Sequence, residues 1–138
     1  MSFDSLKSGV VILYPYLWYR ESDRGETQGR KLRPAAVAVR IARPGKPDTL
    51  ILFPMTTKAP EAGRFMAEIP ETEKRRAGLD SSLRQWIILD EANEEILPGS
   101  YYLEPRPPLG AFSKKFFLPL VLEFIRRRRS IKIVSRTT

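Results

Sequence analysis

Residues 34–55 read PAAVAVRIARPGKPDTLILFPM, and this stretch decides the expected fold. Its two ends, PAAVAVRI at residues 34–41 and TLILFPM at residues 49–55, are apolar and partly β-branched, as buried strands are. Between them, RPGKPD supplies the proline, glycine and aspartate that favour a turn. The stretch therefore predicts a β-hairpin made of two apolar strands.

The residues before the hairpin predict another strand and then a long loop. Residues 9–18 (GVVILYPYLW) are rich in aliphatic and aromatic residues, and Pro15 suits a bulge or an edge position. From residue 20 to residue 32 the only large apolar residue is Leu32, while glycines and mixed charges dominate. Polar loops of this length are uncommon unless they are functional. We therefore expect residues 20–32 to form a mobile surface loop and a candidate gate.

The residues after the hairpin predict two more strands and a short helix. Residues 64–69 (RFMAEI) alternate as a strand does, and residues 85–89 (QWIIL) resemble another strand. Pro70 and Gly78 bracket a short polar stretch in the manner of a helix that starts with proline and stops at glycine. Residues 90–110, which are acidic at first and then rich in proline and glycine, carry no prediction of a regular element.

The C-terminal part holds the one convincing amphipathic helix. Pro119 suits its first turn, and the arginines at 126–129 fall in its last turn, where cations complement the helix dipole. Residues 131–134 (IKIV) predict a terminal strand. One face of the helix is expected to be apolar and to consist of Leu120, Val121, Phe124 and Ile125.

Several short strands with one late helix predict a mainly β fold (α+β) with helices at its margin. The expected architecture is a small, mostly antiparallel barrel or a strongly bent sheet. The length of 138 residues suits a single domain covering residues 1–138. Seven strand residues are expected to be mostly buried: Val11, Leu13, Val37, Val39, Ile51, Ile87 and Leu89.

The chain contains neither cysteine nor histidine, which narrows its chemistry. Disulfides, thiolate metal sites and a cysteine nucleophile are excluded. The imidazole pairs that many ribonucleases use for proton transfer are excluded as well, and so is the commonest metal ligand. Any reaction must use Arg, Lys, Asp, Glu, Ser, Thr or Tyr, and no metal site or cofactor is predicted.

The net charge of +8 is placed unevenly along the chain. Residues 113–138 carry eight Lys and Arg against one Glu, a net of +7, which leaves +1 for residues 1–112. This asymmetry suggests a polyanion or an acidic protein as partner, and a solvated basic tail that aids solubility is the simpler alternative. The arginine cluster at residues 126–129 also has three interpretations: it binds RNA backbone, it binds an acidic partner, or it binds neither.

Neither apolar run in the chain suits a membrane span. Residues 10–19 have little basic charge before them and no small-residue cleavage site after them, so they resemble a strand rather than a signal peptide. Residues 116–125 contain Pro119 and Glu123 and have about half the length that a bilayer requires. We therefore expect a cytoplasmic protein without a membrane span.

Two loop–strand junctions carry the residues that could act chemically. Arg33 ends the polar loop, and Pro34 fixes the backbone beside it, so the guanidinium could grip a phosphate with two hydrogen bonds. An ordinary surface arginine is the alternative. Thr56 and Thr57 follow the second hairpin strand, where a hydroxyl could donate to a phosphate oxygen or satisfy local backbone groups instead.

The order of these pieces resembles the MazF/PemK toxin family. The pieces are GVVILYPYLWY at residues 9–19, GETQGRKLRPAAVAV at residues 25–39 and LILFPMTTKAP at residues 50–60. Leu89-Asp90-Glu91 is similar to a later motif of that family, and a C-terminal helix follows. The similarity spans nearly the whole chain, and the order and spacing of the motifs carry it.

The resemblance implies an SH3-like barrel that acts as a dimer, cleaves single-stranded RNA without a metal and is silenced by an acidic antitoxin. Under this resemblance, Arg33 and Thr56 match the catalytic arginine and threonine, and Glu26 corresponds to a loop glutamate that could serve as the general base. Four neighbours are expected to contact RNA: Arg30, Lys31, Thr57 and Lys58.

Two other functions stay open at the level of sequence. The first is a CcdB-like toxin that poisons DNA gyrase by binding alone, which is disfavoured because Trp18 and Trp86 lie well before the C-terminus. The second is an RNA-binding module with decayed catalysis, in which the basic C-terminus binds phosphates and Tyr101 and Tyr102 stack on bases.

Overall fold

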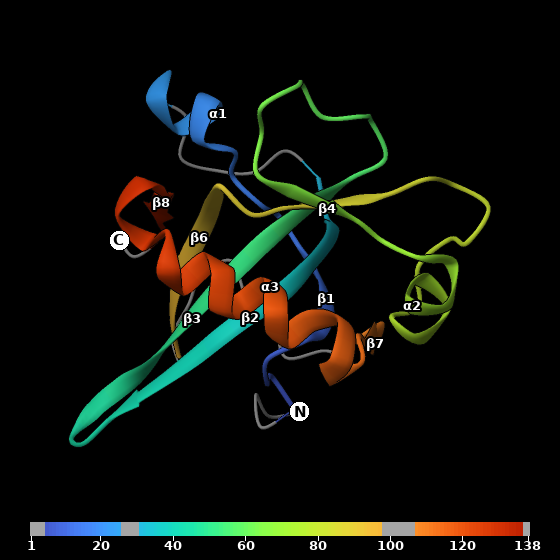
Figure 1. The fold of residues 1–138 in the computed structure, drawn as a ribbon. Coiled ribbons are helices and arrows are strands. Elements are labelled where there is room, and N and C mark those ends of the chain that lie inside the picture. Colours follow the sequence, from blue (N-terminus) through green and yellow to red (C-terminus); the bar gives the residue numbers. More distant parts are fainter. Residues whose placement is uncertain (1–4, 26–30, 98–106, 137–138) are drawn as a thin grey trace.

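The computed structural model describes residues 5–25, 31–97 and 107–136 of the chain. In this part, three helices and a 3₁₀ turn are interspersed among the strands along the chain (Figure 1). The elements are β1 (Val10–Tyr14), α1 (Tyr19–Asp23), β2 (Arg33–Arg43), β3 (Lys46–Thr56), β4 (Met66–Glu68), α2 (Glu71–Arg76), β5 (Trp86–Ile88), β6 (Glu91–Leu97), β7 (Gly110–Ala111), α3 (Lys114–Arg126), a 3₁₀ turn (Arg128–Ser130) and β8 (Lys132–Ser135).

The predicted hairpin forms the centre of the sheet. β2 and β3 pair in antiparallel register, with Ala36 opposite Phe53, and an irregularity between Val37 and Val39 shifts the register by one residue. Gly45 has a φ of 71° in the turn, a conformation that favours glycine. The hairpin is therefore confirmed, and its turn is shorter than the six residues that the sequence offered.

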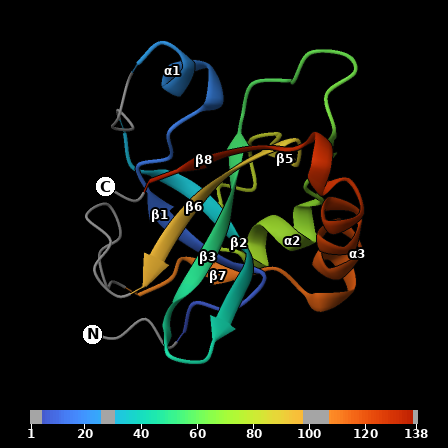
Figure 2. The ribbon, with the colours of Figure 1, turned by 90° about the vertical axis from the view of Figure 1, so that its left-hand side faces the viewer.

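The sheet curls because β3 is shared between several partners. The strands follow the order β4-β5-β3-β2-β1-β7, while β6 joins β3 on one side and β8 on the other. β6 pairs with the first half of β3, and β5 pairs with its last two residues. All pairs are antiparallel except β6 with β8. Figure 2 shows the resulting curvature, which confirms the expected small barrel-like or strongly bent β fold with helices at its margin.

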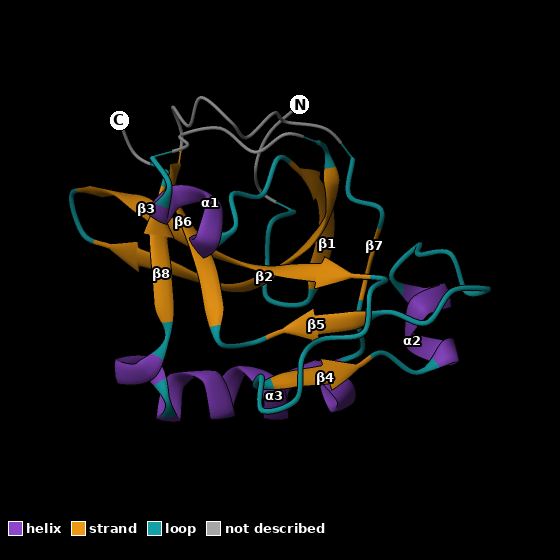
Figure 3. Ribbon diagram, turned by 90° about the horizontal axis from the view of Figure 1, so that it is seen from above, coloured by secondary structure: helices purple, strands orange, loops and turns teal. Residues whose placement is uncertain are grey.

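Both faces of the central strands are buried. On one face, α3 packs over β3, with the Phe53 and Phe124 rings 4.8 Å apart. The other face holds Tyr14, Leu50 and Leu52. Figure 3 shows α3 along one side of the curled sheet. Five of the predicted core residues are buried, and Leu13 and Val39 are partly buried. Each fully buried aliphatic or aromatic side chain contributes about 1.5–3 kcal/mol.

The acidic stretch after β5, which carried no strand prediction, forms the buried strand β6. Glu91, Asn93 and Glu95 alternate on one face of β6, and all three are buried. They have polar partners there: the Tyr14 hydroxyl donates to Glu95, and the Tyr16 hydroxyl donates to Glu91 at 3.1 Å. A buried polar side chain is tolerated when it is hydrogen-bonded, which explains how this composition forms a central strand.

The C-terminal helix starts earlier than its sequence predicted. Ser113 caps it by accepting a hydrogen bond from the Phe116 amide at 3.2 Å, so Pro119 lies inside the helix rather than in its first turn. The buried face shifts accordingly. Ile125, expected on the apolar face, is exposed, whereas Phe117 is buried together with Val121 and Phe124.

The predicted loop at residues 20–32 is partly wrong, because its first residues belong to the short helix α1. The Glu21 carboxylate accepts a hydrogen bond from the Trp18 amide at 3.1 Å, as a capping side chain does. Residues 26–30 lie outside the described residues, so the predicted mobility stays a prediction. The sequence-based strands at 64–69 and 85–89 and the helix after Pro70 are confirmed with shorter bounds, and the strand at 131–134 is confirmed with its bounds shifted by one residue. No described helix is long and apolar enough to span a membrane.

Candidate active site

Arg33 and Thr56 lie at the same end of the β2–β3 hairpin. At this end the paired register closes with Ala35 opposite Pro54, Arg33 is the first residue of β2 and Thr56 is the last residue of β3. On either side, Tyr14 of β1 lies opposite Arg33, and Trp86 of β5 lies opposite Thr56. Residues in such a row share one face of a sheet. The hairpin therefore aligns the two predicted catalytic residues.

The same end of the hairpin carries an open depression of about 310 Å³. Four of the seven predicted site residues line it: Lys31, Arg33, Thr56 and Thr57. The rest of the lining is Pro34, Met55 and Gln85. Lys58 is outside this lining although it is exposed nearby, and Glu26 and Arg30 lie outside the described residues.

The polar groups of the depression face solvent. Arg33 is exposed, and its side chain makes no hydrogen bond or ion pair with another described residue. The Thr56 hydroxyl oxygen accepts a hydrogen bond from the Lys58 amide at 3.1 Å, and the hydroxyl donates only a long hydrogen bond to the Lys58 carbonyl, with 3.4 Å between the two oxygens. This hydroxyl thus satisfies a local backbone group, which was one of the two roles expected from the sequence. It still has a proton to donate to a bound anion.

The described lining carries two cations, Lys31 and Arg33. A cleft lined with charge of one sign attracts ligands of the opposite sign. Guanidinium, ammonium and hydroxyl donors together suit a phosphate group. The described lining contains no carboxylate that could act as a general base.

Gln85 is a lining residue that the sequence did not single out. It is buried, and its side-chain amide donates to the Asp80 carbonyl at 2.9 Å. The main-chain carbonyl of Gln85 accepts a hydrogen bond from the Ile69 amide at 2.8 Å, which fixes the start of β5 beside Thr56. No local motif marks such a residue, because it reaches the site only through the pairing of β5 with β3.

The buried carboxylate of Glu91 links two segments of the chain that are far apart in the sequence. Glu91 accepts hydrogen bonds from the Tyr19 amide at 2.9 Å and the Tyr16 hydroxyl, and its second oxygen accepts from Arg64 at 3.2 Å. Burial raises the pKa of Glu91, and the hydrogen bond from the Tyr19 amide opposes this shift. Burial and the nearby Glu91 charge raise the pKa of Tyr16. Arg64 also binds Asp90 through two hydrogen bonds.

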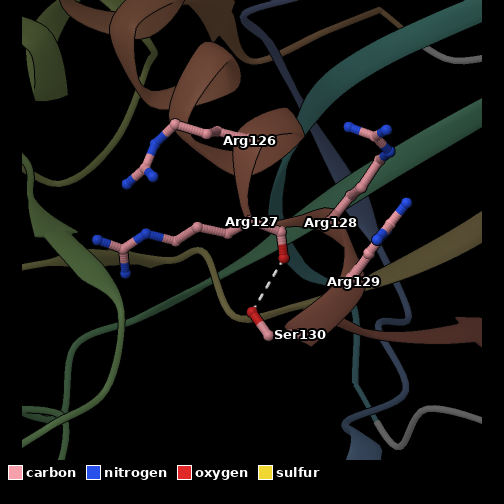
Figure 4. A pocket seen from close by; sticks show the side chains of 5 residues that line it. All are labelled: Arg126, Arg127, Arg128, Arg129 and Ser130. Atoms are coloured by element: carbon pink, nitrogen blue, oxygen red, sulfur yellow. Dashed lines mark hydrogen bonds between the residues drawn. The ribbon is translucent and has the colours of Figure 1, made fainter.

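A second basic surface lies at the C-terminal end of α3. Four arginines and Ser130 line an open pocket of about 390 Å³ there. Figure 4 shows Arg126 and Arg127 on one side and Arg128 and Arg129 on the other. Both arginines of the first pair bind Glu123, and Arg127 also lies 4.1 Å from the Phe65 ring centre. The cluster therefore contains two partly neutralised arginines rather than four free ones.

These ion pairs predict the pH at which the Glu123 carboxyl titrates. Hydrogen bonds from Arg126 and Arg127 lower the pKa of Glu123 from 4.5 to about 2. Because the pKa is lower in the folded chain, the pairs stabilise the fold above the ordinary pKa and are lost as the pH falls through about 2. We expect the NMR titration of the Glu123 carboxyl to have its midpoint near this value. Replacing both arginines by glutamine should return the midpoint toward 4.5, and an unchanged midpoint would contradict the pairing.

Comparison of the sequence with protein-family models and with curated proteins gives no match.

Proposed function

We propose that this protein is a toxin-type endoribonuclease of the MazF/PemK kind, which cleaves single-stranded RNA without a metal ion. The observation that carries the proposal is the convergence of Lys31, Arg33, Thr56 and Thr57 on one open depression. The motif resemblance selects Arg33 and Thr56 as catalytic residues, and Lys31 and Thr57 are two of the neighbours expected to contact RNA. The two cations of the described lining, Lys31 and Arg33, also suit a polyanionic substrate.

The proposed reaction is attack of a ribose 2′-oxygen on the adjacent phosphorus. The bond from the 2′-oxygen to phosphorus forms, and the bond from phosphorus to the 5′-oxygen breaks. The 2′-hydroxyl loses its proton to a base, and the 5′-oxygen gains a proton as it leaves. The products are a 2′,3′-cyclic phosphate and a 5′-hydroxyl. Glu26 is the candidate base under the family resemblance.

Arg33 and Thr56 would stabilise the phosphorane that forms during this attack. Its non-bridging oxygens carry more negative charge than those of the starting phosphodiester, so donors fixed around them bind the transition state more tightly. The Arg33 guanidinium can donate to both of these oxygens, and the Thr56 hydroxyl can donate to one of them as well. By analogy with oxyanion donors, each is worth about 10²–10³-fold in rate.

The proposal extends to the partners of the protein. We propose a cytoplasmic homodimer that an acidic cognate antitoxin holds inactive. The net charge of +8 supports an acidic partner, because opposite charges favour association.

Direct cleavage assays test the proposed activity. Purified protein is incubated with a long single-stranded RNA in EDTA, and new 5′ ends are mapped by primer extension. We expect discrete cuts that persist in EDTA, while the same RNA annealed to its complement stays intact. Single-stranded RNA that remains uncut with and without added Mg²⁺ would overturn the proposal.

Lys31 and Lys58 provide a matched pair for testing RNA binding at the depression. Lys31 lies in the lining and Lys58 lies outside it. We expect Lys31→Gln to reduce the log–log salt slope of single-strand affinity by about 0.7, the amount for one neutralised phosphate. Lys58→Gln should change the slope less. Fluorescence anisotropy with labelled RNA at several salt concentrations measures both slopes, and equal effects would show that the lining does not define the contact surface.

A further inference from the structure

The outer face of α3 carries an apolar stripe that the fold does not bury. Leu118, Leu122 and Ile125 are 40%, 57% and 42% exposed. Their spacing of four and three residues puts them on one side of the helix. This side is distinct from the one that packs on the sheet through Phe117, Val121 and Phe124. The stripe is therefore a separate apolar surface.

Cationic side chains bound this stripe at both ends. Lys114 and Lys115 occupy the first turn of α3, and Arg129 follows its last turn. None of the three makes a hydrogen bond or ion pair with another residue in the described part of the chain. Figure 4 shows Arg129 pointing away from Arg126 and Arg127, the two arginines that bind Glu123.

Helix stability does not explain the two lysines. The first turn of a helix carries the positive end of its dipole, so cations are unfavourable there and carboxylates are favourable. The first turn of α3 has no acidic residue. Lys114 and Lys115 are thus placed against the dipole, and their charge remains available to a ligand.

We propose that this face of α3 docks an acidic amphipathic helix of a partner protein. The stripe would bury the partner's aliphatic side chains, and Lys114, Lys115 and Arg129 would pair with its carboxylates. The 13 residues of α3 span about 20 Å along the helix axis, at 1.5 Å per residue, which is the length of a helix of between three and four turns. An amphipathic helix laid along such a stripe is a recurring mode of recognition.

Two other occupants fit these observations less well. A second copy of this chain would bring Lys114 and Lys115 against Arg129 or against their own copies, and like charges in contact oppose association. RNA gains little from aliphatic side chains, since single-stranded bases bind proteins by stacking on aromatic rings. The stripe itself contains no aromatic residue. The combination of aliphatic side chains and cations therefore favours an acidic helix.

The proposed face differs from the candidate active site. Arg33 lies opposite Tyr14, on the face of the sheet that holds Leu50 and Leu52, whereas α3 covers the other face. The inference therefore does not depend on the nuclease proposal, and a binding assay tests it without RNA cleavage.

The test uses a fluorescein-labelled helical peptide of about 18 residues, with leucines on one face and glutamates elsewhere. We expect saturable binding to the full chain by anisotropy, and weak binding of a peptide with the same composition in scrambled order. Leu122→Ser should weaken binding by about tenfold or more, as a central interface residue does. Leu83→Ser is the matched control because Leu83 is a similarly exposed leucine outside α3.

The charged ends are tested separately. Lys114→Gln with Arg129→Gln should lower the affinity and its salt dependence, while Lys46→Gln at the hairpin tip should leave both unchanged. Equal binding of the scrambled peptide, or an unchanged affinity in Leu122→Ser, would overturn the proposal. So would loss of a dimer in Leu122→Ser by sedimentation, which assigns the face to self-association, or loss of RNA affinity in the Lys114→Gln/Arg129→Gln variant, which assigns it to RNA. All the substituted residues are exposed, so thermal unfolding should show an intact fold in every variant.

Discussion

Arg33→Ala and Thr56→Ala should each slow RNA cleavage by about 10²- to 10³-fold without unfolding the protein. Each substitution removes one donor from the depression at the end of the hairpin. Neither side chain fills the core, since Arg33 is exposed and Thr56 is partly exposed. The free energy of unfolding should therefore change by no more than about 0.5 kcal/mol.

Conservative variants distinguish chemistry from charge. Arg33→Lys keeps the positive charge and loses the planar fork, so we expect it to recover RNA affinity more fully than cleavage. Thr56→Ser keeps the hydroxyl and should retain most of the activity. Arg75→Ala and Thr72→Ala, both on the exposed part of α2, are matched controls that should cleave at the wild-type rate.

Growth arrest provides the second readout for Arg33 and Thr56. Cells that express Arg33→Ala or Thr56→Ala should grow, whereas cells that express the wild type or the α2 controls should arrest. If both variants are folded and still arrest growth as strongly as the wild type, the nuclease assignment is wrong. Gyrase-type binding would then be the better explanation of the toxicity.

Local sequence patterns were sufficient to predict the β2–β3 hairpin and α2. The β2–β3 hairpin has apolar strands on either side of a proline- and glycine-containing turn, and α2 lies between Pro70 and Gly78. β6 could not be predicted in this way. Its acidic residues resemble a loop, and they become buried only because Tyr14 and Tyr16, more than 70 residues earlier, hydrogen-bond to them.

The start of α3 was misplaced because one local signal outweighed another. Proline favours the first turn of a helix, which pointed to Pro119. The Ser113 side chain caps the helix instead and also donates to Glu73 at 2.7 Å, and this contact comes from α2. A capping serine held by a residue 40 positions away is not visible in a local pattern.

The candidate site was predictable only in part. Motif order indicated Arg33 and Thr56, and the register of the hairpin then explains why two residues 23 positions apart in the sequence meet. Gln85 was missed because it enters the site through the pairing of β5 with β3. Register and long-range pairing are properties of the folded sheet, so the sequence supplied the residue types and the fold supplied their geometry.

The largest expected loss of stability comes from Asn93→Ala in β6. Asn93 is fully buried, and its side chain makes both hydrogen bonds of the Leu17 backbone: it accepts from the amide at 2.9 Å and donates to the carbonyl at 2.8 Å. It also accepts from Arg136 at 3.2 Å. Alanine would leave the Leu17 amide and carbonyl buried without these partners, and each such group costs about 1–3 kcal/mol.

We therefore expect Asn93→Ala to lower the free energy of unfolding by about 3 kcal/mol and the melting temperature by roughly 10 °C. Urea unfolding followed by tryptophan fluorescence measures the first quantity. Glu94→Ala, the neighbour on the opposite face of β6, should change it by less than about 0.5 kcal/mol. The variant should also exchange the Leu17 amide proton faster, because this amide loses its hydrogen bond to Asn93. If Asn93→Ala is as stable as the wild type and protects that amide equally well, the buried side chains of β6 do not anchor this segment.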